Sequence, residues 1–565
     1  MPHVITQACC NDASCVAVCP VGCIRPGPDE PGFATTEMLY IDPATCIDCG
    51  VCVPTCPVGA IARDSTLTGI DTRYIDINAA YYEHNPISQS LAPVDLPAPV
   101  VAAGAATLRV AVVGSGPAGS YAAQELLGHP GIEVNMFDRL PTPGGLIRAG
   151  VAPDHPATKS VAALFEPMMA DYRFGLYLDV EIGTHLSHAD LLEHHHAVIY
   201  AHGASGDRRL GIPGEDLPGS VSATEFVNWY NGHPDYAERS FDLSGTRAVI
   251  IGNGNVALDI ARILVADPNR LARTDMADHA VNALRDSNIE EVLVIGRRGP
   301  AQAAYTTPEL LALSALPGID VITDPAEATL DAVSRTVVDD PSSPASLRHK
   351  VQLVAEYATR PATPGNHRIL LRYLAAPVEI LGHDRVTGLR IARNRLDRNE
   401  SGTPNAVPTG VTEDIETGLV LRAVGYRGAP MPDLPFDNTR AVLPNDAGRV
   451  HDPDTNIPLI GVYVTGWIKR GPSGVIGTNK SCAQQTVAAL LADHAAGLLR
   501  APTTSTAQFT AWMHERRPDL ISLTGWRAID SAERQLGQDV SKPRSKITTF
   551  TELRTAAHFS PSPSP

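Results

Sequence analysis

Short apolar runs that end in glycine-rich turns recur along this chain. The run from Arg109, "RVAVVGSGPAGSYAAQELL", predicts a buried strand, a tight turn and an Ala-rich helix, and "IEVNMFD" predicts a second strand ending at Asp138. The stretch "TRAVIIGNGNVALDIARIL" repeats this strand, turn and helix, and "EEVLVIGRRGP" adds a further strand. Later, "GVYVTGWIKRGPSGVIGTNKSCAQQT" gives a strand and a Gly-rich turn leading into a helix. This alternation predicts an α/β protein with two Rossmann-like, doubly wound nucleotide-binding domains.

Length, composition and charge narrow the class of protein. A chain of 565 residues exceeds what one hydrophobic core supports, so we expect several domains. The most apolar stretch, 100–119, is broken by Gly, Arg and Pro, so we expect no membrane span. The N-terminal "MPHVITQACC" lacks the features of a secretory signal, which indicates a cytoplasmic protein. A net charge of -17 argues against broad nucleic-acid binding.

Nine of the ten cysteines fall between Cys9 and Cys56, which marks a small N-terminal module with its own chemistry. The run "CIDCGVCVPTCP" has the spacing C-x2-C-x2-C-x3-C-P, and Cys15, Cys19 and Pro20 repeat its C-x3-C-P ending. This spacing lets three thiolates bind one iron–sulfur cluster while the fourth reaches a second cluster. A structural zinc site is the main alternative, but zinc usually takes two separated pairs and gives no reason for a repeated C-x3-C-P.

Residues 1–62 resemble bacterial-type two-cluster ferredoxins, which implies an α+β ferredoxin-like module. The resemblance implies that one [4Fe-4S] cluster is held by Cys46, Cys49, Cys52 and Cys19. The second cluster would be held by Cys15, Cys56 and either Cys9 or Cys10. The first half lacks a C-x2-C-x2-C run, which favours three ligands and a [3Fe-4S] cluster, with Cys9 preferred over Cys10.

The turn after the first Rossmann-like strand carries the G-x-G-x-x-G pattern at Gly114, Gly116 and Gly119. Glycines at these positions permit a tight turn and close approach of the backbone to a pyrophosphate at the start of the helix. Asp138 ends the next strand, 24 residues after Gly114, where an acidic side chain can bind ribose hydroxyls. Together these features predict a dinucleotide site.

Two further strings, "GLIRAGVAPDHP" and "GWIKRGPSGVIG", resemble the adrenodoxin reductase family of flavoproteins, and the resemblance covers roughly residues 108–545. It implies that the first dinucleotide is FAD. The residues expected around it are Gly114, Gly116, Ala118, Gly119, Asp138, Leu146, Ile182, Trp467, Gly474, Val475 and Ile476. The last three would lie near the flavin ring, where backbone N–H groups can stabilise negative charge.

The second turn has the pattern G-x-G-x-x-A, and Arg297 and Arg298 stand at the end of the later strand, where an NAD site would place an acid. Two guanidiniums suit a 2′-phosphate, so the expected ligand is NADP(H). The resemblance implies that Gly254, Asn255, Val256 and Ala257 meet its pyrophosphate. It also implies that Glu309 contacts NADP.

The candidate catalytic residues are His155, in the "PDHP" string, and Glu309. Some family members read "ELRE" where this chain reads "ELLA" at 309–312, so we expect the acid proposed to pair with the histidine to be absent. His155 is therefore interpreted as a flavin-side residue and not as a general base. Hydride transfer to a flavin depends on geometry and electrostatics and needs no protein base.

The expected organisation has an NADP domain inserted between two halves of an FAD domain. The segments are 1–62 (ferredoxin), 63–107 (linker), 108–212 (FAD, first half), 213–415 (NADP), 416–550 (FAD, second half with a helical region) and 551–565 (disordered tail). The predicted function is NADPH-dependent ferredoxin reduction, with hydride passed to FAD and single electrons to iron–sulfur clusters and a soluble acceptor, such as a ferredoxin or a cytochrome P450 system. The alternatives are a reductase subunit like the small subunit of glutamate synthase, or a redox sensor.

Overall fold

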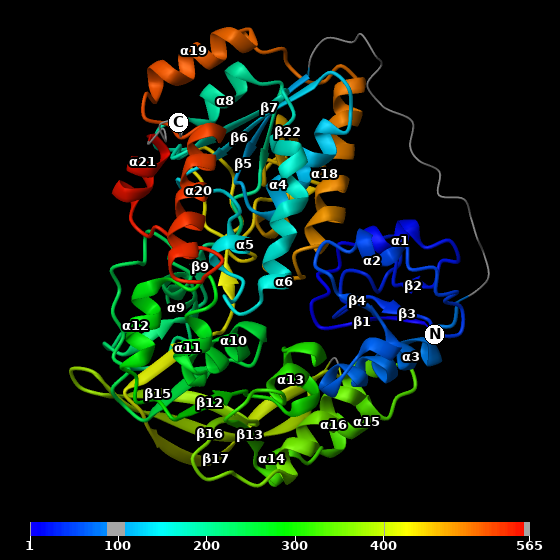
Figure 1. The fold of residues 1–565 in the computed structure, drawn as a ribbon, viewed down its shortest axis with the longest axis vertical. Coiled ribbons are helices and arrows are strands. Elements are labelled where there is room, and N and C mark those ends of the chain that lie inside the picture. The colour runs from blue at the N-terminus through cyan, green and yellow to red at the C-terminus, as the bar shows by residue number, and fades with distance from the viewer. Residues whose placement is uncertain (1, 88–107, 401, 559–565) are drawn as a thin grey trace.

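The computed structural model describes residues 2–87, 108–400 and 402–558, and it divides into three modules (Figure 1). A small N-terminal module lies against the side of a larger body built from two α/β domains. The predicted linker residues 88–107 and tail residues 559–565 lie outside the described residues. In the part of the chain that is described, no helix is long and apolar enough to cross a membrane.

The N-terminal module pairs its strands in two antiparallel ribbons, β1 with β4 and β2 with β3. Its elements are β1 (His3–Ile5), α1 (Ser14–Val18), β2 (Ile24–Arg25), β3 (Tyr40–Ile41), α2 (Cys52–Thr55), β4 (Ile61–Arg63), η1 (Asp64–Thr66), η2 (Gly69–Thr72) and α3 (Arg73–His84). The linker predicted from residue 63 is therefore wrong as far as residue 84. Helix α3 belongs to the module because Asn78 Oδ1 accepts the backbone N–H groups of Ile5 and Ile41, and so ties two strands together.

The FAD-type domain is built on a seven-stranded sheet in the order β20-β21-β22-β8-β5-β6-β7. Its centre is parallel and fully buried, as expected for strands covered by helices on both faces. The strands are β5 (Leu108–Val113), β6 (Ile132–Asp138), β7 (Phe174–Leu178), β8 (Ala197–Tyr200), β20 (Asn445–Asp446), β21 (Arg449–His451) and β22 (Pro458–Val464). The helices are α4 (Pro117–Leu127), α5 (Leu146–Ala149), α6 (Pro156–Lys159), η3 (Ser160–Phe165), α7 (Glu166–Met169), α8 (His188–His194), α17 (Trp467–Arg470), α18 (Thr478–Ala495) and α19 (Thr506–Arg516).

The NADP-type domain has a parallel sheet in the order β10-β18-β11-β12-β14-β13. Its strands are β10 (Ser220–Ser222), β11 (Arg247–Ile251), β12 (Glu291–Ile295), β13 (Ile319–Thr323), β14 (His367–Arg372) and β18 (Leu419–Arg422). Its helices are α9 (Ala223–Tyr230), α10 (Asn255–Val265), α11 (Pro268–Leu271), α12 (Asp278–Arg285), η4 (Pro300–Gln302), α13 (Thr307–Leu313), α14 (Pro325–Ala328), α15 (Ala332–Val338) and α16 (Ala345–Thr359).

An antiparallel sheet and a short ribbon complete the two α/β domains. The sheet comprises β15 (Ala375–Gly382), β16 (Val386–Arg398) and β17 (Pro404–Glu416). The ribbon pairs β9 (Gly206–Asp207) with β19 (Tyr426–Arg427), where the chain leaves the FAD-type domain and returns to it. The boundary expected at residue 415 is wrong, because β18 follows it and pairs with β10 and β11 in the NADP-type sheet.

Two C-terminal helices, α20 (Leu523–Asp539) and α21 (Phe550–His558), pack together beside the FAD-type domain (Figure 1). The disordered tail expected from residue 551 is therefore wrong as far as residue 558. Helix α21 buries Leu553 and binds the Asp179 carboxylate through both Nε and Nη2 of Arg554, at 2.8 and 2.9 Å. These contacts anchor a segment whose neighbouring composition had suggested disorder.

Candidate redox site

The predicted FAD turn is shaped by backbone contacts that exclude any side chain. A Cβ on Gly114 would lie 2.5 Å from the carbonyl oxygen of Ala201, and a Cβ on Gly119 would lie 1.9 Å from the carbonyl oxygen of Gly114. Gly116 precedes α4, whose start has no side-chain hydrogen-bond cap. The first N–H groups of α4 therefore suit a phosphate, as the G-x-G-x-x-G pattern predicts.

Two segments that are distant in sequence converge on this turn. A Cβ on Gly145, whose φ is +49°, would lie 2.8 Å from the Cα of Gly116. A Cβ on Gly466 would lie 2.5 Å from the Cβ of Ala118. The "GGLIR" and "GWIKR" strings thus meet at the first dinucleotide turn, and the close approaches explain why glycine is needed there.

The other predicted FAD residues occupy different surroundings. Asp138 accepts the backbone N–H of Ser115 at 2.9 Å, so its carboxylate braces the glycine turn itself. Leu146 begins α5, and the side chain of Ile182 is buried in the core of the FAD-type domain. Trp467 is half-buried and donates from Nε1 to the carbonyl of Ser473 at 3.1 Å, which closes the loop before the turn at Gly474, Val475 and Ile476.

The second turn repeats this design in the NADP-type domain. A Cβ on Gly252 would lie 2.2 Å from the carbonyl oxygen of Ala423, whereas one on Gly254 would meet nothing within 4 Å. The residues Asn255, Val256 and Ala257 form the first turn of α10, which has no side-chain cap. The start of α10 therefore opens onto free space that suits a pyrophosphate.

Arg297 and Arg298 follow β12 as predicted, and Arg297 is exposed. Burial, and then the positive charge of Arg297, lowers the pKa of Arg298. Two adjacent guanidiniums that repel each other favour a dianionic ligand such as a 2′-phosphate. The donor set thus fits the expected nucleotide.

His155 has an acidic neighbour, and it is not the acid that "ELLA" lacks at position 312. The Glu309 Oε2 atom lies 3.9 Å from His155 Nε2, and Asp259 completes a cluster in which one ligand atom from each residue lies within 4.8 Å of the others. Burial, and then the Asp259 charge, raises the pKa of Glu309, while His155 and Arg262 oppose this shift. The acidic side chain near His155 belongs to Glu309, the first residue of "ELLA". Position 312, where some family members have glutamate, is alanine in this chain.

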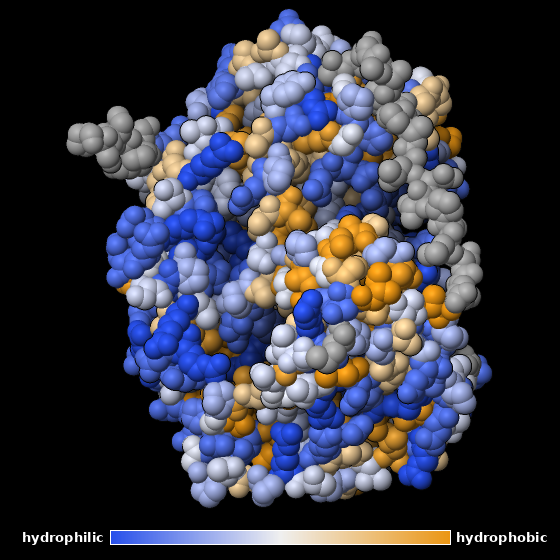
Figure 2. Space-filling model, turned by 45° about the vertical axis from the view of Figure 1, so that its right-hand side comes forward, coloured by the Kyte–Doolittle hydropathy of each residue, from blue (hydrophilic) through white to orange (hydrophobic). Residues whose placement is uncertain are grey.

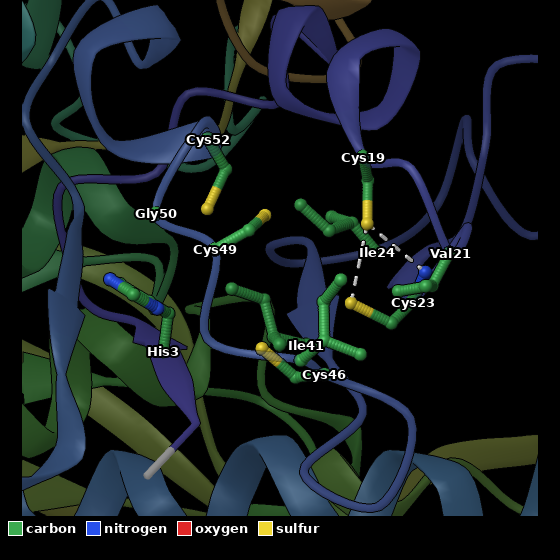
Figure 3. Close-up of a pocket in the computed structure, with 11 residues that line it drawn as sticks. His3, Cys19, Val21, Cys23, Ile24, Ile41, Cys46, Cys49, Gly50 and Cys52 are labelled. Atoms are coloured by element: carbon green, nitrogen blue, oxygen red, sulfur yellow. Dashed lines mark hydrogen bonds between the residues drawn. The ribbon is translucent and has the colours of Figure 1, made fainter.

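The C-x2-C-x2-C run and the crossing cysteine surround one cavity, as Figure 3 shows. Cys46, Cys49, Cys52 and Cys19 line it, and their sulfur atoms point into it. Cys23 also lines this cavity, with its Sγ 3.3 Å from that of Cys19. The four predicted thiols converge on this cavity with the donor chemistry of a [4Fe-4S] cluster, and Cys23 adds a fifth thiol to its lining.

The remaining predicted ligands are close enough to influence one another's charge. Burial, and then negative charge on Cys9 and Cys56, raises the pKa of Cys15. Burial also raises the pKa of Cys9 to about 11, with a smaller contribution from Cys56. Cys9, Cys10, Cys15 and Cys56 therefore lie near one another as a second thiol set, with Cys10 buried among them.

The loop that carries Cys9 and Cys10 is seated on the FAD-type domain. The backbone N–H of Gly477 donates to the carbonyl of Cys10 at 2.7 Å, and a Cβ on Gly477 would lie 2.2 Å from the backbone of Asn11. Tyr121 donates its hydroxyl to Asp12 at 2.9 Å. The second thiol set thus lies next to the 474–477 turn, the segment expected at the flavin ring.

Several residues at the site were not found from the sequence. Cys23 lies outside the spaced cysteine motifs, Gly477 ends the "GWIKRGPSGVIG" string but was not expected to contact the cysteines, and Gln7 and Glu37 carried no motif at all. The last three make contacts over more than 250 residues of sequence separation, so no local pattern signals them.

Comparisons with known proteins agree with this geometry. Residues 8–60 match a family described as 4Fe-4S dicluster domain, and residues 108–298 match one described as pyridine nucleotide-disulphide oxidoreductase. A probable ferredoxin/ferredoxin–NADP reductase of Mycobacterium tuberculosis is 50% identical, over 99% of this chain and 96% of that protein. The mitochondrial NADPH:adrenodoxin oxidoreductase of Arabidopsis thaliana is 39% identical, over 80% of this chain and 95% of that one. The structure of Mycobacterium tuberculosis FprA in complex with NADPH superposes with a TM-score of 0.75 at 44% identity, covering 80% of this chain and 99% of FprA.

Proposed function

Because this chain belongs to the ferredoxin/ferredoxin–NADP reductase family, we propose that its ferredoxin module is the internal electron acceptor of its own reductase module. Bound NADPH and FAD supply hydride transfer, and bound iron–sulfur clusters supply one-electron transfer to a soluble acceptor. The observation that carries the proposal is the hydrogen bond from Gly477 to the carbonyl of Cys10, because it joins the flavin-side turn to a cluster loop.

On the nucleotide side, Arg297 and Arg298 bind the 2′-phosphate, and the start of α10 binds the pyrophosphate. FAD binds at the convergence of the Gly114–Gly119, Gly144–Leu146 and Gly466–Trp467 segments. Steric contacts at Gly145 and Gly466 support this assignment, since they fix the three segments against one another. His155 and Glu309 lie together and act as a polar pair at this site.

The two thiol sets lie at different places, and we assign them different roles in electron transfer. We name the set of Cys9, Cys15 and Cys56 the inner set, because its loop contacts the reductase at Gly477. Its three ligands support a [3Fe-4S] cluster, with Cys9 and not Cys10 as the ligand. The preference for Cys9 over Cys10 comes from the sequence, and the Cys10→Ala variant below tests it.

We name the set of Cys19, Cys46, Cys49 and Cys52 the outer set, because Cys49 is exposed to solvent. Large apolar side chains beside it are exposed as well, namely Ile47, Val51 and Val53. Figure 2 shows hydrophobic side chains gathered on the face that carries the ferredoxin module. The outer set is therefore the exit toward a soluble acceptor in the cytoplasm, either a separate ferredoxin or a cytochrome P450 system.

We propose that electrons reach the inner cluster first and the outer cluster second. Cysteine variants of the whole protein, purified anaerobically, test this order. Cys49→Ala removes an outer ligand, Cys15→Ala removes an inner ligand, and Cys10→Ala is the matched control in the inner loop. Iron analysis and electron paramagnetic resonance (EPR) report which cluster remains and whether NADPH reduces it. We expect about seven irons in the wild type and in Cys10→Ala.

In Cys49→Ala, NADPH should still reduce the inner cluster rapidly, while reduction of cytochrome c falls at least about tenfold. In Cys15→Ala, the outer cluster should remain but be reduced slowly. Ferricyanide reduction should persist in all variants, because this small oxidant takes electrons from the flavin directly. Rapid reduction of the outer cluster in Cys15→Ala would contradict the order, and eight irons in the wild type would contradict the ligand count.

A further inference from the structure

The ferredoxin module also contacts the NADP-type domain, at the helix that carries Glu309. Glu37, in the loop before β3, accepts the backbone N–H of Thr307 through Oε2 at 2.8 Å. Its Oε1 atom lies 3.2 Å from Lys350 Nζ on α16, and the two side chains are only 16% and 10% exposed. Glu37 thus holds the first residue of α13 and pairs with a cation from the neighbouring helix.

A second contact reaches Glu309 directly. The side-chain amide of Gln7 donates to Glu309 Oε2 at 3.4 Å, and this same oxygen is the one 3.9 Å from His155 Nε2. The ionisable groups that face Glu309 are His155, Asp259 and Arg262, and Gln7 adds an amide donor that does not ionise. The hydrogen bond from Gln7 favours the charged form of the carboxylate.

These contacts bring three modules to one point. His155 comes from the FAD-type domain, Glu309 from the NADP-type domain, and Gln7 and Glu37 from the ferredoxin module. Arg262 of α10 also binds the Asp154 carboxylate of the neighbouring module, at 2.7 and 2.9 Å. A shift of the ferredoxin module would therefore move or release the Glu309 carboxylate.

We propose that Glu37 and Gln7 are positioning residues for the nucleotide site, so that the ferredoxin module orients Glu309 toward bound NADP(H). The proposal rests on the proposed function for the identity of the nucleotide, but not on the order of the clusters. By reciprocity of binding free energies, nucleotide binding also tightens the seating of the ferredoxin module on α13.

The test compares Glu37→Ala with Glu37→Gln and with Arg73→Ala in the full-length protein. Glu37→Gln keeps an acceptor oxygen for Thr307. Arg73→Ala is the matched control, because Arg73 binds Glu356 on α16 at 2.8 and 2.9 Å across the same interface. The readouts are the NADP+ dissociation constant, from flavin difference spectra, and hydrogen exchange at the start of α13. The Michaelis constant for NADPH with ferricyanide is measured alongside.

We expect Glu37→Ala to weaken NADP+ binding about tenfold and to speed exchange at Thr307. Glu37→Gln should recover much of this loss, and Arg73→Ala should stay within about twofold of the wild type. Equal effects of Glu37→Ala and Arg73→Ala, or no effect of either, would overturn the proposal. Ferricyanide reduction at saturating NADPH should persist throughout, so its loss would instead count against the proposed function.

If Glu37→Ala does not fold, as judged by iron and flavin content, Gln7→Ala decides the matter. Gln7 is half-buried, and the Gln7→Ala substitution removes only its side-chain amide donor. We expect its loss to raise the NADP+ dissociation constant about threefold, less than a full hydrogen bond to a charged group would give, because the 3.4 Å contact is long and acts on the nucleotide only through Glu309. An unchanged dissociation constant in Gln7→Ala would overturn the proposal.

Discussion

Arg298 is the residue on which the proposed choice between NADPH and NADH depends. Its pKa is lowered by burial and then by Arg297, so the pair holds positive charge at an electrostatic cost in the ligand-free protein. A 2′-phosphate relieves this cost because it offers two negative charges and several acceptor oxygens. NADH lacks that phosphate and gains nothing from the pair.

We therefore expect Arg298→Glu to raise the Michaelis constant for NADPH about 100-fold while changing NADH use little, since only the 2′-phosphate contact is reversed in sign. Steady-state ferricyanide reduction with each nucleotide measures both values. Arg395→Glu is a suitable control, because Arg395 is exposed in the same domain and forms an ion pair with Asp397. Equal losses for the two nucleotides in Arg298→Glu would argue against a 2′-phosphate site.

At the residue scale, the sequence supports predictions where the chemistry requires local spacing. The glycines of the two turns and the three cysteines at 46, 49 and 52 were predicted from such spacing, and Cys19 was predicted from the resemblance to two-cluster ferredoxins. The structure places these four cysteines around one cavity. The pairing of His155 with Glu309 was missed, because it depends on how two domains meet. The contacts of Gln7 and Glu37 were missed for the same reason.

The C-terminal helix α20 stabilises the FAD-type domain through a buried carboxylate. Glu533 of α20 is fully buried and binds Arg148 of α5 at 3.0 Å, and it also binds Arg544 at 3.0 Å. Burial opposes ionisation, but the Arg148 and Arg544 guanidiniums hold the pKa of Glu533 below its ordinary value. Ion pairs therefore hold helix α20 against α5, which follows the turn at Gly145.

Glu533→Gln should destabilise the protein by about 3 kcal/mol, because it leaves Arg148 without its carboxylate partner in a buried place. The loss of stability is measured as a lower midpoint of thermal unfolding. The control is Glu515→Gln, at an exposed position on α19, which should leave the midpoint unchanged. Because the pKa of Glu533 is lowered on folding, its contribution is present above about pH 4.5 and is lost as the pH falls through the lowered value. The difference in unfolding midpoint between the wild type and Glu533→Gln should therefore become smaller in acid. A difference that does not change with pH would contradict a stabilising ionised Glu533.

At the level of elements, strongly apolar strands were predictable and amphipathic helices at the module edges were not. The strands β5, β6, β11 and β12 coincide with the apolar runs of the sequence. Helix α3 was assigned to a linker and most of α21 to a tail, because each is stabilised by a few long-range contacts. Asn78 in α3 and Arg554 in α21 supply those contacts, and neither stands out from its neighbours in sequence.

At the scale of the whole molecule, the ferredoxin module is seated between the two nucleotide domains (Figure 1). It contacts the FAD-type domain at Gly477 and Tyr121, and the NADP-type domain at Thr307 and Glu356. Docking within one chain replaces a collision between two proteins by a contact at high effective concentration. Electron transfer from the reductase to the ferredoxin module should therefore be intramolecular.

The most direct test of this claim is a single turnover of the anaerobic protein with NADPH and no external acceptor. Stopped-flow absorbance follows the flavin, and rapid-freeze EPR follows the clusters, over a tenfold range of protein concentration. The structure predicts that flavin bleaching precedes cluster reduction and that the rate of cluster reduction does not change with protein concentration. A rate that rises in proportion to protein concentration would show that electrons pass between molecules, and it would contradict the internal route.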